Sequence, residues 1–261
     1  MPHVNRRMPQ KHIMAAWLER RVKMQKPGAV RLLEMLSRNH HLAAKVDEDD
    51  FPLAAFDCLQ SWQQNRLAVT FGDLICQDAY RPAVNFFLAE IYGGLDFRER
   101  DQDMHKVMPV MKRFLPDRVL YIMSEAFELQ AISLEFDLEM ARQMRLRGWH
   151  ELDISRYCEV YLACGNREGR ERQILLIRKL GYDLEKLVDK PLVNTLVRLL
   201  RGPAHAAGFG KLQEFLEAGL GSFRAMDDIG FFNETIYQRE WNSMERLFAG
   251  EEDPFGRESP T

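Results

Sequence analysis

Apolar residues recur along this chain at intervals of three and four positions, the spacing that places side chains on one face of an α-helix. In the predicted helix over residues 10–25, for example, Ile13, Trp17 and Met24 form one stripe and arginines occupy the opposite face. Nowhere in the sequence do four or more β-branched or aromatic residues alternate cleanly with polar ones. The pattern therefore predicts helices throughout and strands that are absent or trivial.

Proline and glycine mark where these helices begin and end. Pro52 and Pro82 stand at expected helix starts, and Gly148 ends the longest predicted helix. The predicted helices cover residues 10–25, 28–39, 52–77, 82–92, a helix from 96 that Pro109 interrupts, 116–147, 153–164, 168–188, 191–201, 209–225 and 229–249. Residues 40–50 are expected to form a polar connection. The sequence thus predicts an all-α fold, a single multi-helix bundle of about ten helices with no significant sheet.

Charge is distributed unevenly along the chain. Residues 1–46 hold ten Lys or Arg and two Glu, about +8, whereas the whole chain has a formal net charge of −3. We therefore predict a basic N-terminal helical segment over 1–46, a helical core domain over 47–250 and a flexible acidic tail over 251–261. The basic segment is expected to be a solvated helix face, or to dock on the acidic body, on another copy or on an anionic partner.

Neither a membrane span nor a signal peptide is predicted. The most apolar runs, such as residues 119–123, are far shorter than the roughly 18 apolar residues that cross a bilayer. The apolar stretch 13–18 is followed at once by the charged residues 19–21, with no small-residue cleavage site after it. We therefore expect a cytoplasmic protein.

The sequence lacks the usual metal and cofactor motifs. No Glu is followed three residues later by His, which excludes the common di-iron signature of helical bundles. His150 and Glu151 lack the second His of a helical zinc protease, and after Lys211 a leucine replaces the Ser or Thr of a phosphate-binding loop. The sequence therefore predicts no catalytic residue, no metal site and no cofactor.

The four cysteines form no Cys-x-x-Cys pair and are expected to be reduced and buried: Cys58, Cys76, Cys158 and Cys164.

Acidic residues cluster on the longest predicted helix, at Glu125, Glu128, Glu135, Asp137 and Glu139. Glu128 stands out because Phe127 and Leu129 flank it, so its carboxylate is a candidate for burial. A buried carboxylate needs a cationic partner. The candidate partners are Arg81, Arg100 and Arg113. A structural ion pair is favoured over a catalytic carboxylate, and both interpretations stay open.

Five residues are candidates to line a binding pocket between helices: Arg81, Arg100, Asp101, Glu128 and His205. His105 lies near apolar residues and is a candidate axial haem ligand, although a lone His is more often a surface or packed residue. The thirteen methionines indicate an adaptable core or groove rather than a cofactor site.

Several strings of the sequence resemble a known family. They begin with Tyr80-Arg-Pro-Ala-Val-Asn and occupy residues 80–93, 96–101, 115–116, 201–204, 212–217, 223–226 and 235–240. Over about residues 50–245 they resemble a family of uncharacterised bacterial all-helical proteins. The resemblance implies a bacterial, helical, cytoplasmic protein, and it supplies no activity, cofactor or catalytic residue.

Two classes of function remain open. The first is a binding or regulatory module that encloses an apolar small ligand or presents a face to a protein partner or to a second copy of itself; the lack of a catalytic signature favours it. The second is an enzyme with a site between helices, built on Glu128 and arginines such as Arg81 and Arg100, or a haem protein that uses His105. Nucleic acid is the least favoured partner, because no aromatic residues are interleaved with the basic ones, and no membrane contact is expected.

Overall fold

The computed structural model describes residues 26–90, 115–188 and 210–256, with a few further residues between 108 and 113 and between 190 and 198. Of the residues described, 82% are helical and none lies in a strand, which confirms the all-α prediction. The elements are α2 (Pro27–Ala44), the 3-10 helix η1 (Lys45–Asp47), α3 (Leu53–Thr70), α4 (Gly72–Ile75), α5 (Arg81–Glu90), α7 (Asp117–Leu146), α8 (Ile154–Cys164), α9 (Arg167–Val188), α11 (Gly210–Arg224) and α12 (Ile229–Ala249).

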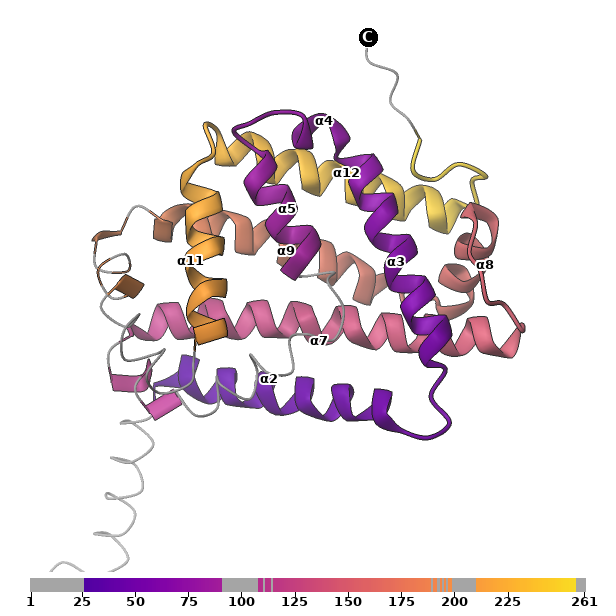
Figure 1. The fold of residues 1–261 in the computed structure, drawn as a ribbon, viewed down its shortest axis with the longest axis horizontal. Helices are drawn as coiled ribbons and strands as arrows, with labels where there is room; N and C mark the ends of the chain where they lie inside the picture. The colour runs from indigo at the N-terminus through magenta and orange to yellow at the C-terminus, as the bar shows by residue number, and fades with distance from the viewer. Residues whose placement is uncertain are drawn as a thin grey trace, which may run out of the picture.

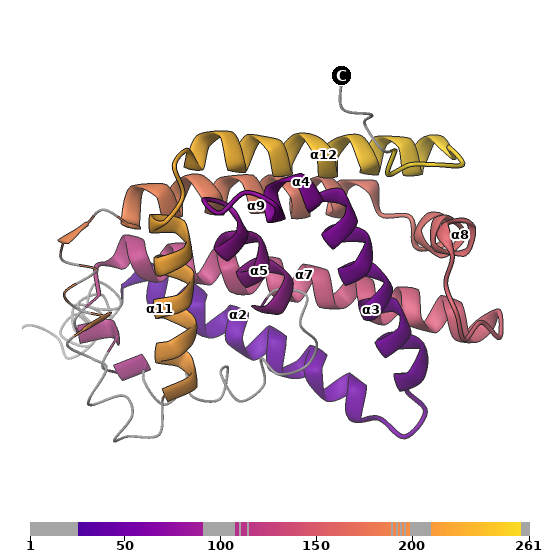
Figure 2. The same ribbon diagram turned by 45° about the horizontal axis from the view of Figure 1, so that its top comes forward.

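Four long helices form one layer of the molecule. They lie side by side in the order α12, α9, α7 and α2, with their axes close to one direction (Figure 1). The helices α3, α5 and α11 cross this layer on one face, and α8 lies beside the end of α7 (Figure 2). The core lies between this layer and the crossing helices and also between neighbouring helices of the layer, such as α7 and α9.

The long helix α7 begins and ends where the sequence predicts. Pro116 precedes its first turn, where the ring is compatible with helical φ, and no proline or glycine interrupts its thirty residues. Gly148 then adopts a φ of 68°, which lets the Trp149 N–H donate to the Met144 carbonyl oxygen at 3.0 Å. This pattern satisfies the last carbonyl groups of the helix and stops it.

The helix α2 packs along α7 with little space between the two backbones. The Gly28 N–H donates to Asp117 Oδ1 at 2.9 Å, and a side chain on Gly28 would come within 2.5 Å of the Asp117 carbonyl oxygen. Farther along, Arg38 donates two hydrogen bonds to Glu135. Within residues 26–44, the basic N-terminal segment therefore docks on the acidic body of the same chain.

Two predicted boundaries differ from the structure. Helix α2 continues to Ala44, through the start of the polar connection predicted over residues 40–50, because its last turns still bury apolar side chains. The predicted helix 52–77 is broken at Phe71, where φ is −109° and ψ is 20°, so that α3 and α4 are separate. Three predicted helices lie wholly or mostly outside the described residues: 10–25, the one that starts at 96, and 191–201.

The segment after α12 packs back onto the bundle. The Phe255 ring lies edge-on to Trp62 and Tyr157, with ring centroids 5.8 Å apart in both pairs. The Arg66 guanidinium lies 5.1 Å from the centroid of the same ring. Phe255 thus anchors the chain up to residue 256, which differs from the flexible tail that the polar composition of residues 251–261 predicts.

Candidate ligand-binding site

Two small cavities lie next to each other inside the bundle, and Ile177 of α9 and Glu240 of α12 line both of them. The first has a volume of about 50 Å³ and lies among α3, α7, α8, α9 and α12. We call it the polar cavity, because its walls include Gln63, Arg66, Asp137, Tyr157, Tyr161 and Arg170. The second has a volume of about 40 Å³, and we call it the apolar cavity. Its other lining residues are Leu67, Phe71, Val84, Phe87, Leu88 and Ile236.

Polar residues reach the first cavity because they occupy core-facing positions of otherwise apolar stripes. On α3, Gln63 lies one turn after Leu59 and one turn before Leu67, and all three side chains are buried. On α9, Arg170 lies one turn before Ile174, and both are buried. Helical periodicity therefore directs an amide and a guanidinium into the interior.

Arg170 is the most unusual group in the polar cavity. The residue is only 6% exposed, and its guanidinium packs against two aromatic rings, 3.7 Å from the centroid of Phe136 and 4.4 Å from that of Tyr161. Its Nη2 donates to Met140 Sδ at 3.2 Å and its Nη1 to Gln173 Oε1 at 3.4 Å, whereas no acceptor among the described residues pairs with Nε. No carboxylate in the described ranges lies within ion-pair distance of it. The arginine is thus a buried cation held by ring faces and weak acceptors.

Asp137 of α7 lines the same cavity and is buried. Burial raises the pKa of this carboxyl to about 6, and a hydrogen bond from Gln63 and the positive charge of Arg170 offset the effect only in part. The Gln63 amide donates to Asp137 Oδ1 at 3.1 Å. A carboxyl in this environment gains or loses its proton just below neutral pH.

The remaining charged groups of the polar cavity are paired. Arg66 donates to both carboxylate oxygens of Glu240, one of them at 3.1 Å. The phenol groups of Tyr157 and Tyr161 line the wall formed by α8, and burial raises the pKa of both above the usual value of 10. Both phenols therefore stay protonated at neutral pH and can donate hydrogen bonds.

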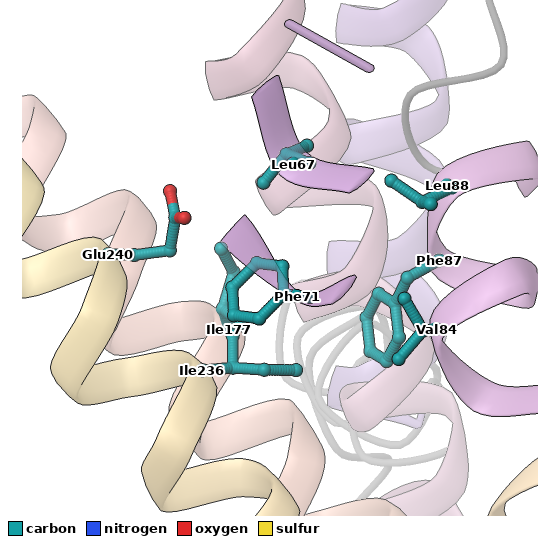
Figure 3. A pocket seen from close by; sticks show the side chains of 8 residues that line it. All are labelled: Leu67, Phe71, Val84, Phe87, Leu88, Ile177, Ile236 and Glu240. Carbon is teal, nitrogen blue, oxygen red and sulfur yellow. The ribbon is translucent and has the colours of Figure 1, made fainter. Parts of the chain in front are cut away.

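The apolar cavity lies between α3, α5, α9 and α12. In Figure 3, Val84, Phe87 and Leu88 of α5 lie across the space from Leu67 and Phe71. The only polar side chain drawn there is that of Glu240, at the edge toward α12. This cavity offers contact to hydrocarbon and few polar partners.

The sequence singles out Glu128, and the structure places it on another face of α7. The carboxylate is 8% exposed and accepts hydrogen bonds from Arg31 of α2, at 2.5 Å, and from Arg172 of α9, at 3.0 Å to Nε. Burial alone would raise the pKa of Glu128, but the hydrogen bonds and charges of Arg172 and Arg31 outweigh it and hold the pKa below its usual value. Glu128 therefore joins three helices through an ion-pair bridge.

Of the arginine partners that the sequence offered for Glu128, neither Arg81 nor Arg113 pairs with it. Arg81 lies at the start of α5, where it pairs with Asp78 at 2.7 Å and donates to the Ile75 carbonyl oxygen at 2.8 Å. Arg113 is exposed. The partners were missed because helix packing, not sequence distance, decides which arginine meets a buried carboxylate. The other candidates lie outside the described residues: Arg100, Asp101, His105 and His205.

The cysteines are free thiols, and the prediction that they are buried is wrong. Cys76 is exposed, and the other three are half-buried. Burial raises the pKa of the Cys158 thiol, and it raises that of Cys164 to about 11, so both stay protonated at neutral pH.

No group of three or more His, Cys, Asp or Glu side chains within the described ranges is arranged to hold a metal ion. None of the helices described is long and apolar enough to cross a membrane.

Sequence reasoning passed over the residues that form the polar cavity. Asp137 was noted only as one carboxylate in a row, while Gln63, Arg66, Arg170 and Glu240 were not singled out. A usable signal was present, because Gln63 and Arg170 each interrupt an apolar stripe at a core-facing position.

The fold and the cavities define a helical bundle with a polar and an apolar cavity between its helices. This chain belongs to the family described as a domain of unknown function (DUF8198), whose model matches residues 43–254. Comparisons with curated proteins and with solved structures find no match. The family assignment confirms the resemblance to a family of unknown function, and the function has to be argued from the site.

Proposed function

We propose that this protein is a binding module that holds a small ligand, or the apolar part of one, among α3, α5, α9 and α12. The apolar cavity is the observation that carries this proposal. Protein interiors are normally packed as densely as organic crystals, and an unfilled space costs about 24 cal/mol per Å³. A cavity of about 40 Å³ thus costs roughly 1 kcal/mol while it is empty. A ligand that fills the space recovers these lost contacts.

The size and lining of the cavity define the kind of ligand. Its walls are Leu, Ile, Val and Phe side chains, which favour hydrocarbon over polar groups. A volume of about 40 Å³ admits only a few non-hydrogen atoms in the conformation described. The expected occupant is therefore a small apolar group, in keeping with the binding class favoured by the sequence.

Xenon is a suitable probe, because dry apolar cavities take it up. We expect methyl resonances of residues around the cavity, such as Val84, to shift under xenon pressure in an NMR experiment on the full chain. Val84→Leu should fill the space and abolish the response without loss of stability. The matched control is Val160→Leu, a fully buried position that lines neither cavity, where the added methylene should cost about 1–3 kcal/mol and leave the xenon response intact. Methyl shifts equal in wild type and Val84→Leu would refute the proposal.

A further inference from the structure

The polar cavity also points to the chemistry of the ligand. We propose that it is an anion site, in which the edge of the Arg170 guanidinium binds a small carboxylate whose short hydrocarbon part extends into the apolar cavity. The extension into the apolar cavity rests on the proposed function, whereas the anion site stands on its own contacts.

Among the residues that the structure describes, Arg170 lacks the anionic partner that a buried cation normally has. A buried cation is normally paired with an anion, because removal of a charge from water is costly without compensation. Arg170 is 94% buried, and in the described part of the chain its nearest acceptors are a thioether and an amide oxygen, with Nε unpaired. Its unused hydrogen-bonding capacity matches a carboxylate, which can accept two parallel N–H bonds from a guanidinium.

Two aromatic rings pack against the Arg170 guanidinium, whose Cζ lies 3.7 Å from the centroid of Phe136 and 4.4 Å from that of Tyr161. Neither ring offers an in-plane acceptor, so the Nε–H at the edge of the guanidinium, unpaired within the described ranges, remains for a ligand. Recognition through the edge is how arginine holds planar oxyanions. Stacking also fixes the guanidinium before the ligand arrives, which reduces the entropy lost on binding.

The charge balance of the polar cavity depends on the protonation state of Asp137. The charged and titratable groups that face Asp137 are Arg66 of α3, Tyr157 and Tyr161 of α8, Arg170 of α9 and Glu240 of α12. Arg66 and Glu240 neutralise each other, and both phenols stay uncharged. When Asp137 is ionised it balances Arg170 and repels an incoming anion. When Asp137 is protonated, the charge of Arg170 is left for the ligand, and the Asp137 carboxyl can donate a hydrogen bond to the anion.

Binding of the anion is therefore coupled to uptake of one proton by Asp137. Burial raises the pKa of Asp137 to about 6 in the free protein, and a bound anion raises it further. Affinity must then increase as the pH falls from 7.5 to 5.5, while a simple carboxylate remains mainly ionised over this range.

The two adjacent cavities limit the length of the ligand. Ile177 and Glu240 line both spaces, so a ligand that extends from Arg170 toward Val84 and Phe87 has to pass these two side chains. Volumes of about 50 and 40 Å³ accommodate a carboxylate with a few carbon atoms and exclude a long acyl chain.

The test is calorimetric titration of the full chain at constant ionic strength with formate, butyrate, butanol and butylamine. We expect butyrate to bind more tightly than formate, butanol to bind weakly and butylamine not to bind. Butyrate affinity should rise about tenfold from pH 7.5 to pH 5.5. Equal binding of butyrate and butanol, or affinity independent of pH, would overturn the anion site.

Three variants assign the effect to residues. Arg170→Met keeps an unbranched side chain against the two rings and should lose at least tenfold in butyrate affinity while it keeps the xenon response. Arg170→Lys, which retains the charge without the planar fork, serves if the first variant does not fold, and it should also bind at least tenfold more weakly. Asp137→Asn should bind butyrate with an affinity that no longer changes between the two pH values. Arg172→Met, on the same helix but at Glu128, is the matched control and should bind as wild type.

The two proposals fail in different ways. A xenon response without any carboxylate binding would leave the apolar ligand site standing and show that the polar cavity takes up water only. Formate binding that depends on Arg170, without a xenon response, would leave the anion site standing and refute the apolar one.

Discussion

Two buried carboxyl groups on the same helix, Glu128 and Asp137, have pKa values shifted in opposite directions. Glu128 accepts hydrogen bonds from two arginines, and their charges hold its pKa below the usual value. Asp137 accepts one from a neutral amide, and its pKa rises to about 6. Burial acts on both in the same direction, so the difference comes from their partners.

The positions of the two residues explain why their partners differ. They lie about two and a half turns apart, which places them on opposite faces of α7. Glu128 faces the seam where α2 and α9 bring arginines to the edge of the bundle, with side chains 33% and 55% exposed. Asp137 faces the polar cavity, where neither Arg66 nor Arg170 forms an ion pair with it. The first arrangement joins three helices, and under our proposal the second leaves the charge of Arg170 for a ligand.

The largest effect is expected from Asp137→Asn. The folded pKa of about 6 lies above the ordinary value of 3.8, so the folded state favours the protonated form. Its contribution to stability is full below about pH 3.8 and is lost as the pH rises through 6. The amide should therefore raise the free energy of unfolding by about 2–3 kcal/mol at pH 8 and change it little at pH 4. Urea unfolding at both pH values measures this, and an unchanged stability at pH 8 would contradict it.

Phe255→Ala should make Asp137 behave more like an exposed carboxyl. The ring lines the polar cavity and packs on Trp62 and Tyr157, so its removal opens the cavity to water. We expect the pKa of Asp137 to fall toward 3.8, as followed by NMR titration of its carboxyl carbon, and the protein to lose about 1–2 kcal/mol of stability. Phe231→Ala, at an exposed position of α12 away from both cavities, should leave the pKa of Asp137 unchanged.

Glu128→Gln should lower the free energy of unfolding by about 1–2 kcal/mol at pH 7, because two arginines lose their charged acceptor. The cost stays modest because both arginines reach solvent. The folded pKa lies below the ordinary value of 4.5, so the contribution is present above about pH 4.5 and is lost as the pH falls through the folded pKa. A thermal melt that shows higher stability for the variant would instead identify Glu128 as a strained functional group.

The smallest effect is expected from Glu135→Gln. Its pair with Arg38 joins the same two helices as the pair of Glu128 with Arg31, but the Glu135 side chain is 42% exposed, whereas that of Glu128 is 8% exposed. Exposed ion pairs contribute less than about 1 kcal/mol, so we expect a change within 0.5 kcal/mol in urea unfolding, roughly the median for such pairs. A loss as large as that of Glu128→Gln would show that burial does not set the difference between the two pairs.

Local signals in the sequence were sufficient for most helices. The prediction of 153–164 comes within one residue of α8, because Asp153 caps the helix by accepting a hydrogen bond from the Arg156 N–H at 2.8 Å. The prediction of 229–249 agrees with α12. Asp228 is the N-cap of this helix, and Gly250, with a φ of 74°, is its C-cap. Caps and periodicity act within a few residues, so the sequence shows them directly.

The partners in the site could not be found in this way. Arg31 lies 97 positions from Glu128, and its approach depends on the close crossing of α2 and α7. The polar cavity is a space left where five helices meet. Such a space depends on how the helices pack, so no single residue in the sequence predicts it. Only Gln63 and Arg170, as polar residues within apolar stripes, gave a local sign of an unusual interior.

The packed position of Phe255 has a consequence for synthesis of the chain. The walls of the polar cavity are contributed from Gln63 onward, and the last of them is Phe255, beyond α12. A ribosome that has translated only as far as α9 has supplied Arg170 and Asp137 but not the helix and aromatic ring that cover them. The polar cavity is therefore complete only when translation has passed residue 255, and under our proposal a nascent chain binds no ligand there before its last helix has docked.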